Sequence, residues 1–479
     1  MGGTNDSTFA SYRQSRRDHW DSVARKMDSW AGWGRAYHER LIQIYRFWAA
    51  PRQRVLEIGC GHGHLLASLR PSLGVGVDFS PEMVKRARAL HPELEFIEAD
   101  GHDLHLPLGP FDVIILSDLI DDLWDVQRVF EQIKRLCHVR TRVIINAYSR
   151  LWELPLAAAA KLGAAKPRLT QNWLTCDDVT HLLNLSGFEV IRVWQEVLWP
   201  LGTPFVAALC NKILVKSWPF KFLAMTNFFL ARPCQEITRK RPMVSVIVAA
   251  RNEAGNIAQI FGRTPQMGAG TELVFVEGHS RDDTYGVIEK EMALHPEFRS
   301  RLLRQQGTGK GDAVRLGIAH AGGDIVMILD ADMTVPPEAL QRFYDALYEG
   351  RGEFINGVRL VYPMEDEAMR FFNFMGNKFF SVAFSWILGQ PVKDTLCGTK
   401  VFWRRDYELI AANRTTFGDF DPFGDYDLIF GAAKLGLKIV DLPVRYRART
   451  YGSTNIRRWK HGWLLLRMVF FAARRIKFT

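Results

Sequence analysis

The sequence predicts an α/β protein that consists of two doubly wound domains, one in each half of the chain. In both halves, short apolar runs of strand length alternate with charged, amphipathic stretches of helix length. Polar or glycine-rich turns follow several of the apolar runs, as in open sheets that bind ligands at their strand ends. Between residues 197 and 242 the alternation stops and prolines interrupt the chain, which favours a connection between two domains.

The expected strands are short runs rich in Val, Ile, Leu and Phe. In the first half they lie at 54–58, 74–78, 94–98, 111–116, 141–147 and 188–194, with helices at 63–70, 81–90, 125–137 and 177–186. In the second half strands lie near 244–249, 272–277, 301–304, 324–329 and 354–358. We therefore predict a first domain at 1–196, an apolar and basic linker at 197–241, and a second domain at 242–479.

The composition is that of folded domains, because 47% of the 479 residues are hydrophobic and 24% are charged. The six cysteines have neither zinc-site spacing nor the look of a disulfide framework, which favours a reducing compartment. The first residues are polar and charged, without the apolar core of a secretory signal. No run reaches the roughly 18 to 20 apolar residues of a membrane span. We expect a cytoplasmic protein.

A glycine-rich turn, Glu-Ile-Gly-Cys-Gly-His-Gly at 57–63, follows the first expected strand. Glycine permits a sharp turn and close approach of a ligand, and the N-terminus of the next helix offers N–H groups to an anion. Asp78 ends the second strand, where a carboxylate can accept hydrogen bonds from both hydroxyls of a ribose. Asp100 ends the third strand, at a position suited to contact with an adenine.

Over roughly residues 15–195 this pattern resembles the class I S-adenosylmethionine-dependent methyltransferases. An NAD site is the alternative, but the acidic residue before the glycines and the Gly-x-Gly-x-Gly spacing argue against it. The resemblance implies that S-adenosylmethionine is the cofactor. It also implies that the residues that bind it are Glu57, Gly59, Gly61, Gly63, Asp78 and Asp100.

Polar residues also follow the fourth expected strand, near the place where the methyl group should lie. Methyl transfer from a sulfonium mainly requires positioning, although a hydroxyl acceptor benefits from a base. The candidates there are Ser117, Asp118, Asp121 and Asp122, but a solvated helix cap is the alternative interpretation, and we assign no base among them. A domain that binds the cofactor without catalysis is a further alternative.

In the second half, four polar motifs come in order at expected strand ends. They are Arg-Asn-Glu at 251–253, the acidic stretch at 277–284, the glycine-rich loop at 307–313 and Asp-Ala-Asp at 330–332. Two carboxylates on one turn can hold a hard cation through oxygen, and the cation can neutralise a leaving diphosphate. An isolated Asp-x-Asp is usually a polar turn, so the prediction depends on all four motifs together.

Across about 242–460 these motifs resemble family 2 glycosyltransferases of the GT-A fold, and most of all the polyprenyl-phosphate sugar transferases, including dolichyl-phosphate mannosyltransferases. One departure is Glu277-Gly278, where many members have two aspartates, and this puts the preferred donor base in doubt. The resemblance implies that Glu253 and Glu277 contact the nucleoside and that Lys310 and Asp312 line the nucleotide rim. It also implies that Asp330 and Asp332 hold Mg²⁺ or Mn²⁺ and the diphosphate.

The acceptor side of such an enzyme is implied by two later segments. Residues 393–400, with Asp394 and Lys400, resemble the acceptor-binding segment, and a loop with a strand edge is the alternative. Asp425 matches a carboxylate that is catalytic in members that glycosylate hydroxyls, and with Asp332 it forms the expected catalytic set. A phosphate acceptor is already anionic, so Asp425 would then orient groups instead of acting as a base.

The end of the chain is strongly basic. Residues 444–479 contain ten Lys or Arg and no Asp or Glu, which accounts for the net charge of +10. A helix with apolar residues three or four apart is expected at 456–478, and it suits a membrane interface. A helix docked on the catalytic domain is the alternative. Arg449 is a candidate ligand of an acceptor phosphate, and no recognition motif supports nucleic-acid binding.

These expectations combine into a bifunctional, peripheral membrane transferase. The second domain is expected to transfer a sugar, with inversion, from a nucleotide sugar to a polyprenyl or dolichyl phosphate or a glycan. The first domain is expected to transfer a methyl group from S-adenosylmethionine. The alternative is a glycosyltransferase that acts on a saccharide hydroxyl, with a first domain that only senses the cofactor or serves in docking.

Overall fold

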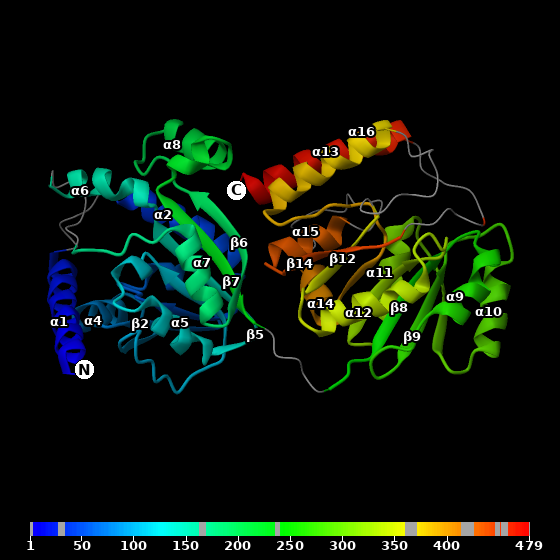
Figure 1. Ribbon diagram of the computed structural model, residues 1–479, viewed down its shortest axis with the longest axis horizontal. Helices are drawn as coiled ribbons and strands as arrows, with labels where there is room; N and C mark the ends of the chain where they lie inside the picture. The colour runs from blue at the N-terminus through cyan, green and yellow to red at the C-terminus, as the bar shows by residue number, and fades with distance from the viewer. Residues whose placement is uncertain are drawn as a thin grey trace. The chain divides into compact units, whose positions relative to one another are not determined.

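A computed structural model describes residues 3–26, 34–161, 169–234, 240–359, 371–412, 426–445, 451 and 458–478. The chain forms two compact units, Met1–Cys234 with the last two residues, and Gln235–Lys477. Each unit contains one seven-stranded sheet with helices packed against it (Figure 1). The predicted fold class is therefore confirmed for both halves.

The sheet of the first unit has the strand order β3-β2-β1-β4-β5-β7-β6. The first five strands run parallel, whereas β7 is antiparallel to both of its neighbours. The strands are β1 Arg54–Ile58, β2 Leu73–Asp78, β3 Glu95–Glu98, β4 Phe111–Ser117, β5 Cys137–Tyr148, β6 Phe188–Glu196 and β7 Thr226–Pro233.

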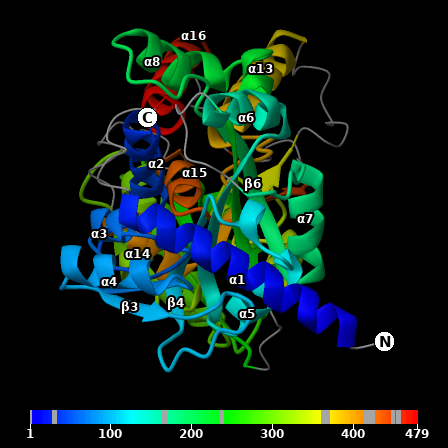
Figure 2. The same ribbon diagram turned by 90° about the vertical axis from the view of Figure 1, so that its left-hand side faces the viewer.

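Three helices in the described part of this unit begin where local side chains satisfy free backbone N–H groups. Ser80 caps α4, Asp125 caps α5, and Thr175 with Asp178 forms a capping box at α7. Helix α1 packs on α4 and crosses the unit in Figure 2. The helices are α1 Gly3–Lys26, α2 Arg35–Trp48, α3 His64–Ser68, α4 Pro81–Leu90, α5 Val126–Lys134, α6 Glu153–Lys161, α7 Cys176–Leu185 and α8 Val206–Ala208.

Strand β7 lies within the segment predicted as a linker at 197–241. It pairs with β5 and β6, and Phe228 and Phe229 are buried. The first unit therefore extends to Cys234 instead of ending at 196. The physical reason is that the run of apolar residues in β7 fills the gap between two strands of the sheet, whereas the prolines before it only interrupt short helical turns.

The sheet of the second unit has the order β10-β9-β8-β11-β13-β12-β14. The first four strands in this order run parallel, and β13 is antiparallel to β11 and β12. Strands β13 and β14 were not predicted, because the first has four residues and the second contains Asp and Pro. The strands are β8 Val244–Ala250, β9 Thr271–Glu277, β10 Arg299–Arg304, β11 Ile325–Asp330, β12 Phe354–Val358, β13 Lys400–Trp403 and β14 Ile439–Pro443.

The core of the second unit is formed by fully buried side chains of β8, β9 and β11, among them Val246, Phe275 and Leu329. Among the described residues no helix is both long enough and apolar enough to cross a membrane. The helices are α9 Ile257–Arg263, α10 Thr284–Leu294, α11 Lys310–His320, α12 Leu340–Tyr348, α13 Phe371–Leu388, α14 Arg404–Ala412, α15 Tyr426–Lys434 and α16 Arg458–Ala472, which continues as a π-helical turn at Ala473–Lys477.

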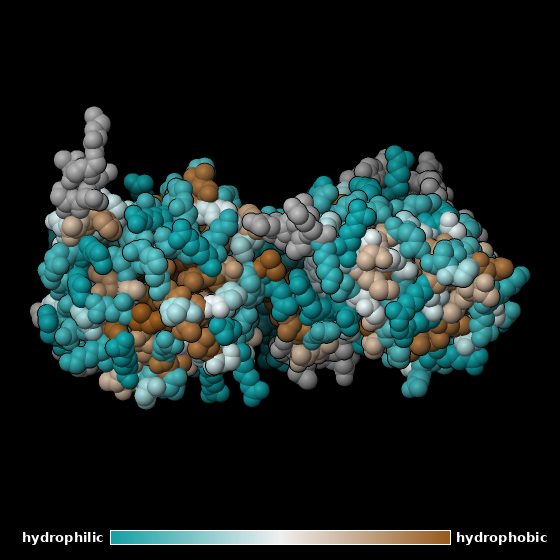
Figure 3. Space-filling view, turned by 90° about the horizontal axis from the view of Figure 1, so that it is seen from below, coloured by the Kyte–Doolittle hydropathy of each residue, from teal (hydrophilic) through white to brown (hydrophobic). Residues whose placement is uncertain are grey.

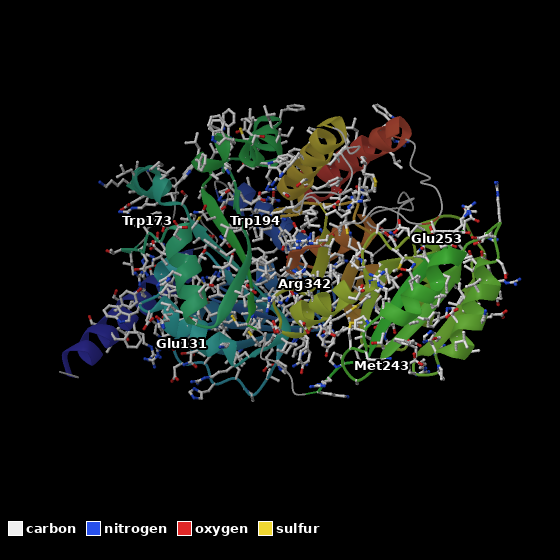
Figure 4. All side chains as sticks on the ribbon, turned by 45° about the vertical axis from the view of Figure 1, so that its right-hand side comes forward. Glu131, Trp173, Trp194, Met243, Glu253 and Arg342 are labelled. Atoms are coloured by element: carbon white, nitrogen blue, oxygen red, sulfur yellow. The ribbon has the colours of Figure 1, made fainter. Side chains whose placement is uncertain are left out.

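Both sheets have a switch point where the strand order reverses, between β1 and β4 in the first unit and between β8 and β11 in the second. Ligands of open α/β sheets bind at the carboxyl ends of the strands near such a point. In Figure 4, Met243 before β8 and Glu253 after it lie at opposite edges of the second sheet, so Glu253 marks the carboxyl edge. Hydrophilic residues cover most of the face of each unit seen in Figure 3.

Candidate active sites

The glycine turn of the first unit has the backbone geometry that the sequence requires. Gly59, Gly61 and Gly63 have φ angles of 71°, 52° and 73°, in the left-handed region that favours glycine. The backbone N–H groups of Gly59 and Cys60 both donate to the carbonyl oxygen of Val77, at 2.7 and 3.1 Å. The turn is therefore fixed against the end of β2, beside Asp78.

Asp78 is buried beside this turn. Its Oδ2 accepts a hydrogen bond from Gly61 N at 2.9 Å, and its Oδ1 accepts one from Ser80 N at 2.9 Å. Burial raises the pKa of Asp78 to about 6, although these N–H donors oppose the shift. The structure thus places the predicted ribose ligand next to the glycine turn, as an acceptor whose charge changes near neutral pH.

Glu57 is buried at the end of β1, and its Oε2 accepts a hydrogen bond from Leu66 N at 3.0 Å. Burial raises the pKa of Glu57 to about 8, while the hydrogen bond from Leu66 lowers it and nearby Asp78 raises it further. Helix α3 is shorter than predicted, with five residues at 64–68, and one of its N–H groups is already engaged by Glu57.

Asp100 is held by two cationic or polar partners. Its Oδ1 lies 2.7 Å from His102 Nδ1, and its Oδ2 lies 2.9 Å from Arg13 Nε on α1. Because His102 Nε2 accepts a hydrogen bond from Asp125 N at 3.1 Å, Nδ1 carries the proton that is donated to Asp100. Burial raises the pKa of Asp100, but the bonds from His102 and the charge of Arg13 outweigh this, so the pKa is lowered.

Helix α1 also binds the loop after β4. Arg16 NH1 lies 2.7 Å from Asp122 Oδ1, Trp20 Nε1 donates to Asp122 Oδ2 at 2.8 Å, and Tyr12 donates to the Asp122 carbonyl at 2.6 Å. The residues of this helix carry no motif, so the sequence predicts no role for it. The structure makes it a cover for the edge that holds Asp100 and Asp122.

A polar cluster at the ends of β4 and β5 surrounds Asp118. Tyr37 OH donates to Asp118 Oδ1 at 2.8 Å, and Asn146 Nδ2 donates to the same oxygen. Tyr45 OH in turn donates to Asn146 Oδ1 at 2.6 Å, and Ser117 donates to that oxygen at 3.0 Å. Tyr37 and Tyr45 were not predicted, because they lie on a helix without a motif. Asn146 carried a usable signal, because it is a polar residue at the end of a predicted strand.

The position of Asp78 predicts that the affinity for S-adenosylmethionine depends on pH. The ionised carboxylate is the form that accepts hydrogen bonds from ribose hydroxyls. Since the pKa of Asp78 is raised from 3.8 to about 6, protonation should weaken binding as the pH falls below about 6, by at most about tenfold per pH unit. Isothermal titration between about pH 8 and about pH 5 measures this.

Asp78→Asn is the control, because an amide does not titrate. This variant should bind the cofactor weakly over the same pH range and lose the change near pH 6. An unchanged pH profile in the variant would assign the effect to another group.

In the second unit, the loops after β8 and β9 bind each other. Glu253 N donates to Thr284 Oγ1 at 3.0 Å, and Asn256 Nδ2 donates to Glu253 Oε2 at 2.7 Å. Glu277 is buried, and its Oε1 accepts a hydrogen bond from Ser280 N at 2.5 Å. The structure therefore brings the two predicted nucleoside ligands to one edge, each already oriented by its own loop.

The glycine-rich loop before α11 joins this edge. Gln305 Nε2 donates to Asp312 Oδ2 at 2.9 Å and to the carbonyl of Gly309 at 2.8 Å. A side chain at Gly278 would come within 2.9 Å of Gln305 Oε1, so the unusual glycine after Glu277 leaves room for this glutamine. Gln305 was missed by sequence analysis, although it directly follows a predicted strand.

Asp330 ends β11 and forms an ion pair with a lysine. Its Oδ1 lies 2.5 Å from Lys310 Nζ, the first residue of α11. Burial raises the pKa of Asp330, but Lys310 and then Lys400 and Arg359 outweigh burial, so the pKa is held below its ordinary value. Asp332, two residues on, accepts bonds from Thr334 N at 3.1 Å and Thr334 Oγ1 at 2.6 Å.

The predicted acceptor segment at 393–400 lies against the same aspartate. Asp394 is buried in a two-point ion pair, with Arg359 Nε at 2.7 Å and NH2 at 2.9 Å. Burial raises the pKa of Asp394, but Arg359 outweighs burial and lowers it. Lys400 is fully buried and donates to the carbonyl of Cys397. Arg359 was missed by sequence analysis, although it follows the strand predicted at 354–358.

Two predicted site residues, Asp425 and Arg449, lie outside the described residues. Tyr451, near Arg449 in the sequence, donates to Asp282 Oδ2 at 3.2 Å. Asp282 also accepts from Ala254 N at 3.3 Å, so Tyr451 lies at the edge that holds Glu253.

The predicted C-terminal helix is present as α16, and it packs against α13. Leu465, Met468 and Ala472 are buried, so one side of the helix is docked. Trp463 and Phe470 remain exposed, together with Leu466 and the side chains of Arg467, Arg474 and Arg475. The structure thus confirms a helix docked on the second unit, and contact with a membrane interface stays a prediction.

The chemistry of the second site fits a divalent cation. Carboxylate oxygens are the ligands that Mg²⁺ and Mn²⁺ prefer, and Asp330 and Asp332 supply them. Within the part of the chain that is described, no group of three or more His, Cys, Asp or Glu side chains forms a metal cluster. Mg²⁺ commonly binds one or two carboxylates and completes its shell with water and phosphate oxygens, so two aspartates suit a cation that binds together with a diphosphate.

Gly398 permits the close approach of the acceptor segment to this site. A methyl group at this position would overlap Asp330 Oδ2 and Lys310 Nζ. Gly398→Ala should therefore displace the segment or the ion pair, and weaken metal-dependent donor binding about tenfold or more. Titration of a nucleotide sugar with Mn²⁺ measures this. Gly262→Ala on α9, where a methyl group meets open space, is the control and should bind donor normally.

Comparison with known proteins agrees with the two folds. Residues 245–408 match the family model described as glycosyl transferase family 2, and residues 55–139 match the model described as a methyltransferase domain. The chain therefore combines a family 2 glycosyltransferase domain with a methyltransferase domain, in the predicted order.

The relatives of the second unit are sugar transferases. Glycosyltransferase AglJ of Haloferax volcanii is 29% identical over 224 residues, which is 46% of this chain and 69% of that protein. The dolichyl-phosphate hexose transferase of the same organism is 26% identical over 214 residues, 44% of this chain and 86% of that protein. Dolichol-phosphate mannosyltransferase of Saccharomyces cerevisiae is 35% identical over 112 residues, 22% of this chain and 41% of that protein.

The chain spans less than two thirds of several other relatives, for example 62% and 34% of two undecaprenyl-phosphate 4-deoxy-4-formamido-L-arabinose transferases. Among solved structures, glucosyl-3-phosphoglycerate synthase of Mycobacterium tuberculosis has a TM-score of 0.37 at 20% identity, and covers 52% of this chain and 86% of that chain. Magnesium protoporphyrin IX methyltransferase of Synechocystis has a TM-score of 0.35 at 18% identity, with coverage of 46% and 99%.

Proposed function

We propose that the second unit transfers a sugar from a nucleotide sugar to a polyprenyl or dolichyl phosphate, in a reaction that depends on a divalent metal. The observation that carries this proposal is the carboxylate pair after β11, in which Asp330 is kept ionised among Lys310, Lys400 and Arg359. Relatives named dolichyl-phosphate and undecaprenyl-phosphate sugar transferases support the lipid phosphate as the acceptor.

In this proposal the residues at the carboxyl edge of the second sheet bind different parts of the donor. Glu253 and Glu277 would contact the nucleoside, and Asp330 and Asp332 would hold Mg²⁺ or Mn²⁺. When bound, the cation neutralises the charge that develops on the leaving diphosphate. Lys310 is already placed to compensate phosphate charge beside Asp330.

The acceptor would approach from the side of the 393–400 segment. Here the buried Lys400 and the partly buried Arg359 would give a positive environment for an anionic phosphate. Arg449 would contribute to binding of the acceptor, and Asp425 would orient it. The displacement would invert the configuration at the anomeric carbon of the sugar.

For the first unit we propose methyl transfer from S-adenosylmethionine. The glycine turn, Glu57 and Asp78 converge at the switch point of the sheet, which supports a cofactor site there. Asp100 would lie near the adenine. The methyl acceptor would lie by the cluster around Asp118, and coupling to the product of sugar transfer is a hypothesis from the fusion alone.

We further propose that the protein works at the cytoplasmic face of a membrane, which it contacts through α16. The exposed Trp463 and Phe470 and the nearby arginines suit an interface with anionic lipid. A lipid phosphate acceptor would also require access to such a surface.

The test uses the purified chain with a panel of nucleotide sugars, Mn²⁺ or Mg²⁺, a polyprenyl phosphate and labelled S-adenosylmethionine. Formation of a sugar lipid that requires metal supports the first proposal, and its absence with every donor rejects it. Label in the sugar product supports coupled methylation, whereas label that never enters any acceptor supports a cofactor-sensing unit.

Asp425→Asn separates the two acceptor classes. A large loss of rate supports a hydroxyl acceptor that needs a base, whereas near-normal transfer to the lipid phosphate supports the proposal made here.

A further inference from the structure

A large exposed apolar surface of the first unit is formed by residues 199–223, which we call the apolar protrusion. It consists of α8, a π-helical turn at Leu209–Ile213 and short 3-10 turns at Leu214–Lys216 and Phe220–Leu223. Helix α8 lies at the top of this unit in Figures 1 and 2. Phe205 is 91% exposed and Trp218 is 77% exposed, so most of each ring faces solvent. Such clusters on one surface indicate an interaction site.

A second segment extends this surface. Trp152 Nε1 donates to the carbonyl of Leu223 at 2.9 Å, and Ser149 N donates to the carbonyl of Met225 at 2.7 Å. The start of α6 is thereby held beside the protrusion, and it adds the exposed side chains of Leu151 and Leu154.

The protrusion has a rigid base, so its exposed side chains are held in place. Asn211 is buried, and its Oδ1 accepts from Leu198 N and Trp199 N at 2.8 Å each, while its Nδ2 donates to Trp199 O at 2.7 Å. Beneath it, Glu196 is buried in ion pairs with Lys216 and with Arg40, the latter at 3.2 Å. The polar groups of the base are paired, whereas the exposed apolar side chains above it would gain free energy if a partner removed them from water.

The charge pattern indicates what that partner is. Residues 197–234 contain no Asp or Glu, and the protrusion carries Lys212 and Lys221. Lys221 Nζ lies 5.0 Å from the centre of the Phe222 ring, so a cation and an aromatic ring lie next to each other on the protrusion. Protein interfaces are depleted in Lys, whereas membrane interfaces combine Trp and Phe with Lys whose amine reaches the headgroups. The start of α6, which adjoins the protrusion, carries one acidic residue, Glu153.

We propose that the apolar protrusion is a membrane-docking surface of the methyltransferase unit, which inserts into the interfacial layer of a bilayer that contains anionic lipid. This surface is distant from α16 in the sequence and belongs to the other unit. It would hold the methyltransferase site at the membrane even when α16 is detached, and it depends on neither transferase activity.

The experiment is flotation of the full-length protein with vesicles of phosphatidylcholine and phosphatidylglycerol. The test variant is Leu209→Ser/Leu223→Ser, which changes two leucines that are 50% and 56% exposed. The matched control is Leu90→Ser/Leu185→Ser, at 51% and 56% exposure elsewhere in the same unit. Both pairs are also made in a Trp463→Ser/Phe470→Ser background, which removes the two most exposed large apolar side chains of α16.

The test pair should lower vesicle affinity about tenfold or more in both backgrounds, and the control pair should leave it unchanged. Equal binding by the two pairs would overturn the proposal. So would a change in oligomeric state without a change in vesicle binding, because the surface would then bind a second copy. Thermal unfolding checks that the variants fold. Phe205→Ser gives the same test at a side chain that is 91% exposed.

Discussion

Asp330→Asn and Asp332→Asn, each made alone, should lower metal-dependent sugar transfer at least about 100-fold. Asparagine keeps the size and one oxygen of each side chain, but it removes the negative charge that attracts a divalent cation. For Asp330 the loss has a second consequence, because Lys310 loses its 2.5 Å ion pair and Lys400 and Arg359 lose a nearby anion. The measurement is the initial rate of sugar lipid formation as a function of Mn²⁺ concentration.

The control for these variants is Asp345→Asn, which changes a carboxylate on α12 that is bound by Gln341 at 2.9 Å. It should transfer sugar at the rate of the wild type. Thermal unfolding of all three variants separates a loss of metal from a loss of fold. If the Asp330 and Asp332 variants kept both Mn²⁺ affinity and rate, the carboxylates would be structural and the proposed mechanism would be rejected.

The parallel strands could be predicted because each is a buried apolar run that ends at a polar turn. Strands β1 and β8 show this, since each is followed by a motif with glycine or a carboxylate. The position of strand β7 in the sheet could not be predicted, because β7 lies between β5 and β6, which are its pairing partners and are distant in the sequence. Strand β13 was missed because Lys400, its first residue, looks like a surface residue, yet it is fully buried beside Asp330.

The same distinction applies to the site residues. Motif residues such as Asp78 and Asp330 could be located because a local pattern places them at strand ends. Arg359 and Tyr37 could not, because their roles come from a partner carboxylate that is distant in sequence. The sequence therefore predicts acidic groups better than the cations and hydroxyls that hold them in place.

Glu57→Gln should abolish most cofactor binding and yet stabilise the cofactor-free first unit at alkaline pH. Burial raises the pKa of Glu57 from 4.5 to about 8, so the folded state keeps a proton that the unfolded state releases. The wild type therefore loses stability as the pH rises between these two values, and above about pH 8 the loss is complete. The amide of the variant cannot ionise, and its oxygen can still accept the hydrogen bond from Leu66.

Above about pH 8 the variant should thus be more stable than the wild type by an amount on the order of a few kcal/mol, and near pH 5 the two should be similar. Denaturant unfolding across this range measures the difference, with Glu131→Gln at an exposed position of α5 as a control that should show none. Above about pH 8, where Glu57 of the wild type is ionised, the affinity of the variant for S-adenosylmethionine should be at least about tenfold lower, because the amide lacks the charge that favours a cationic ligand. A variant with unchanged alkaline stability would mean that Glu57 ionises freely in the fold, whereas unchanged affinity would mean that the cofactor binds elsewhere.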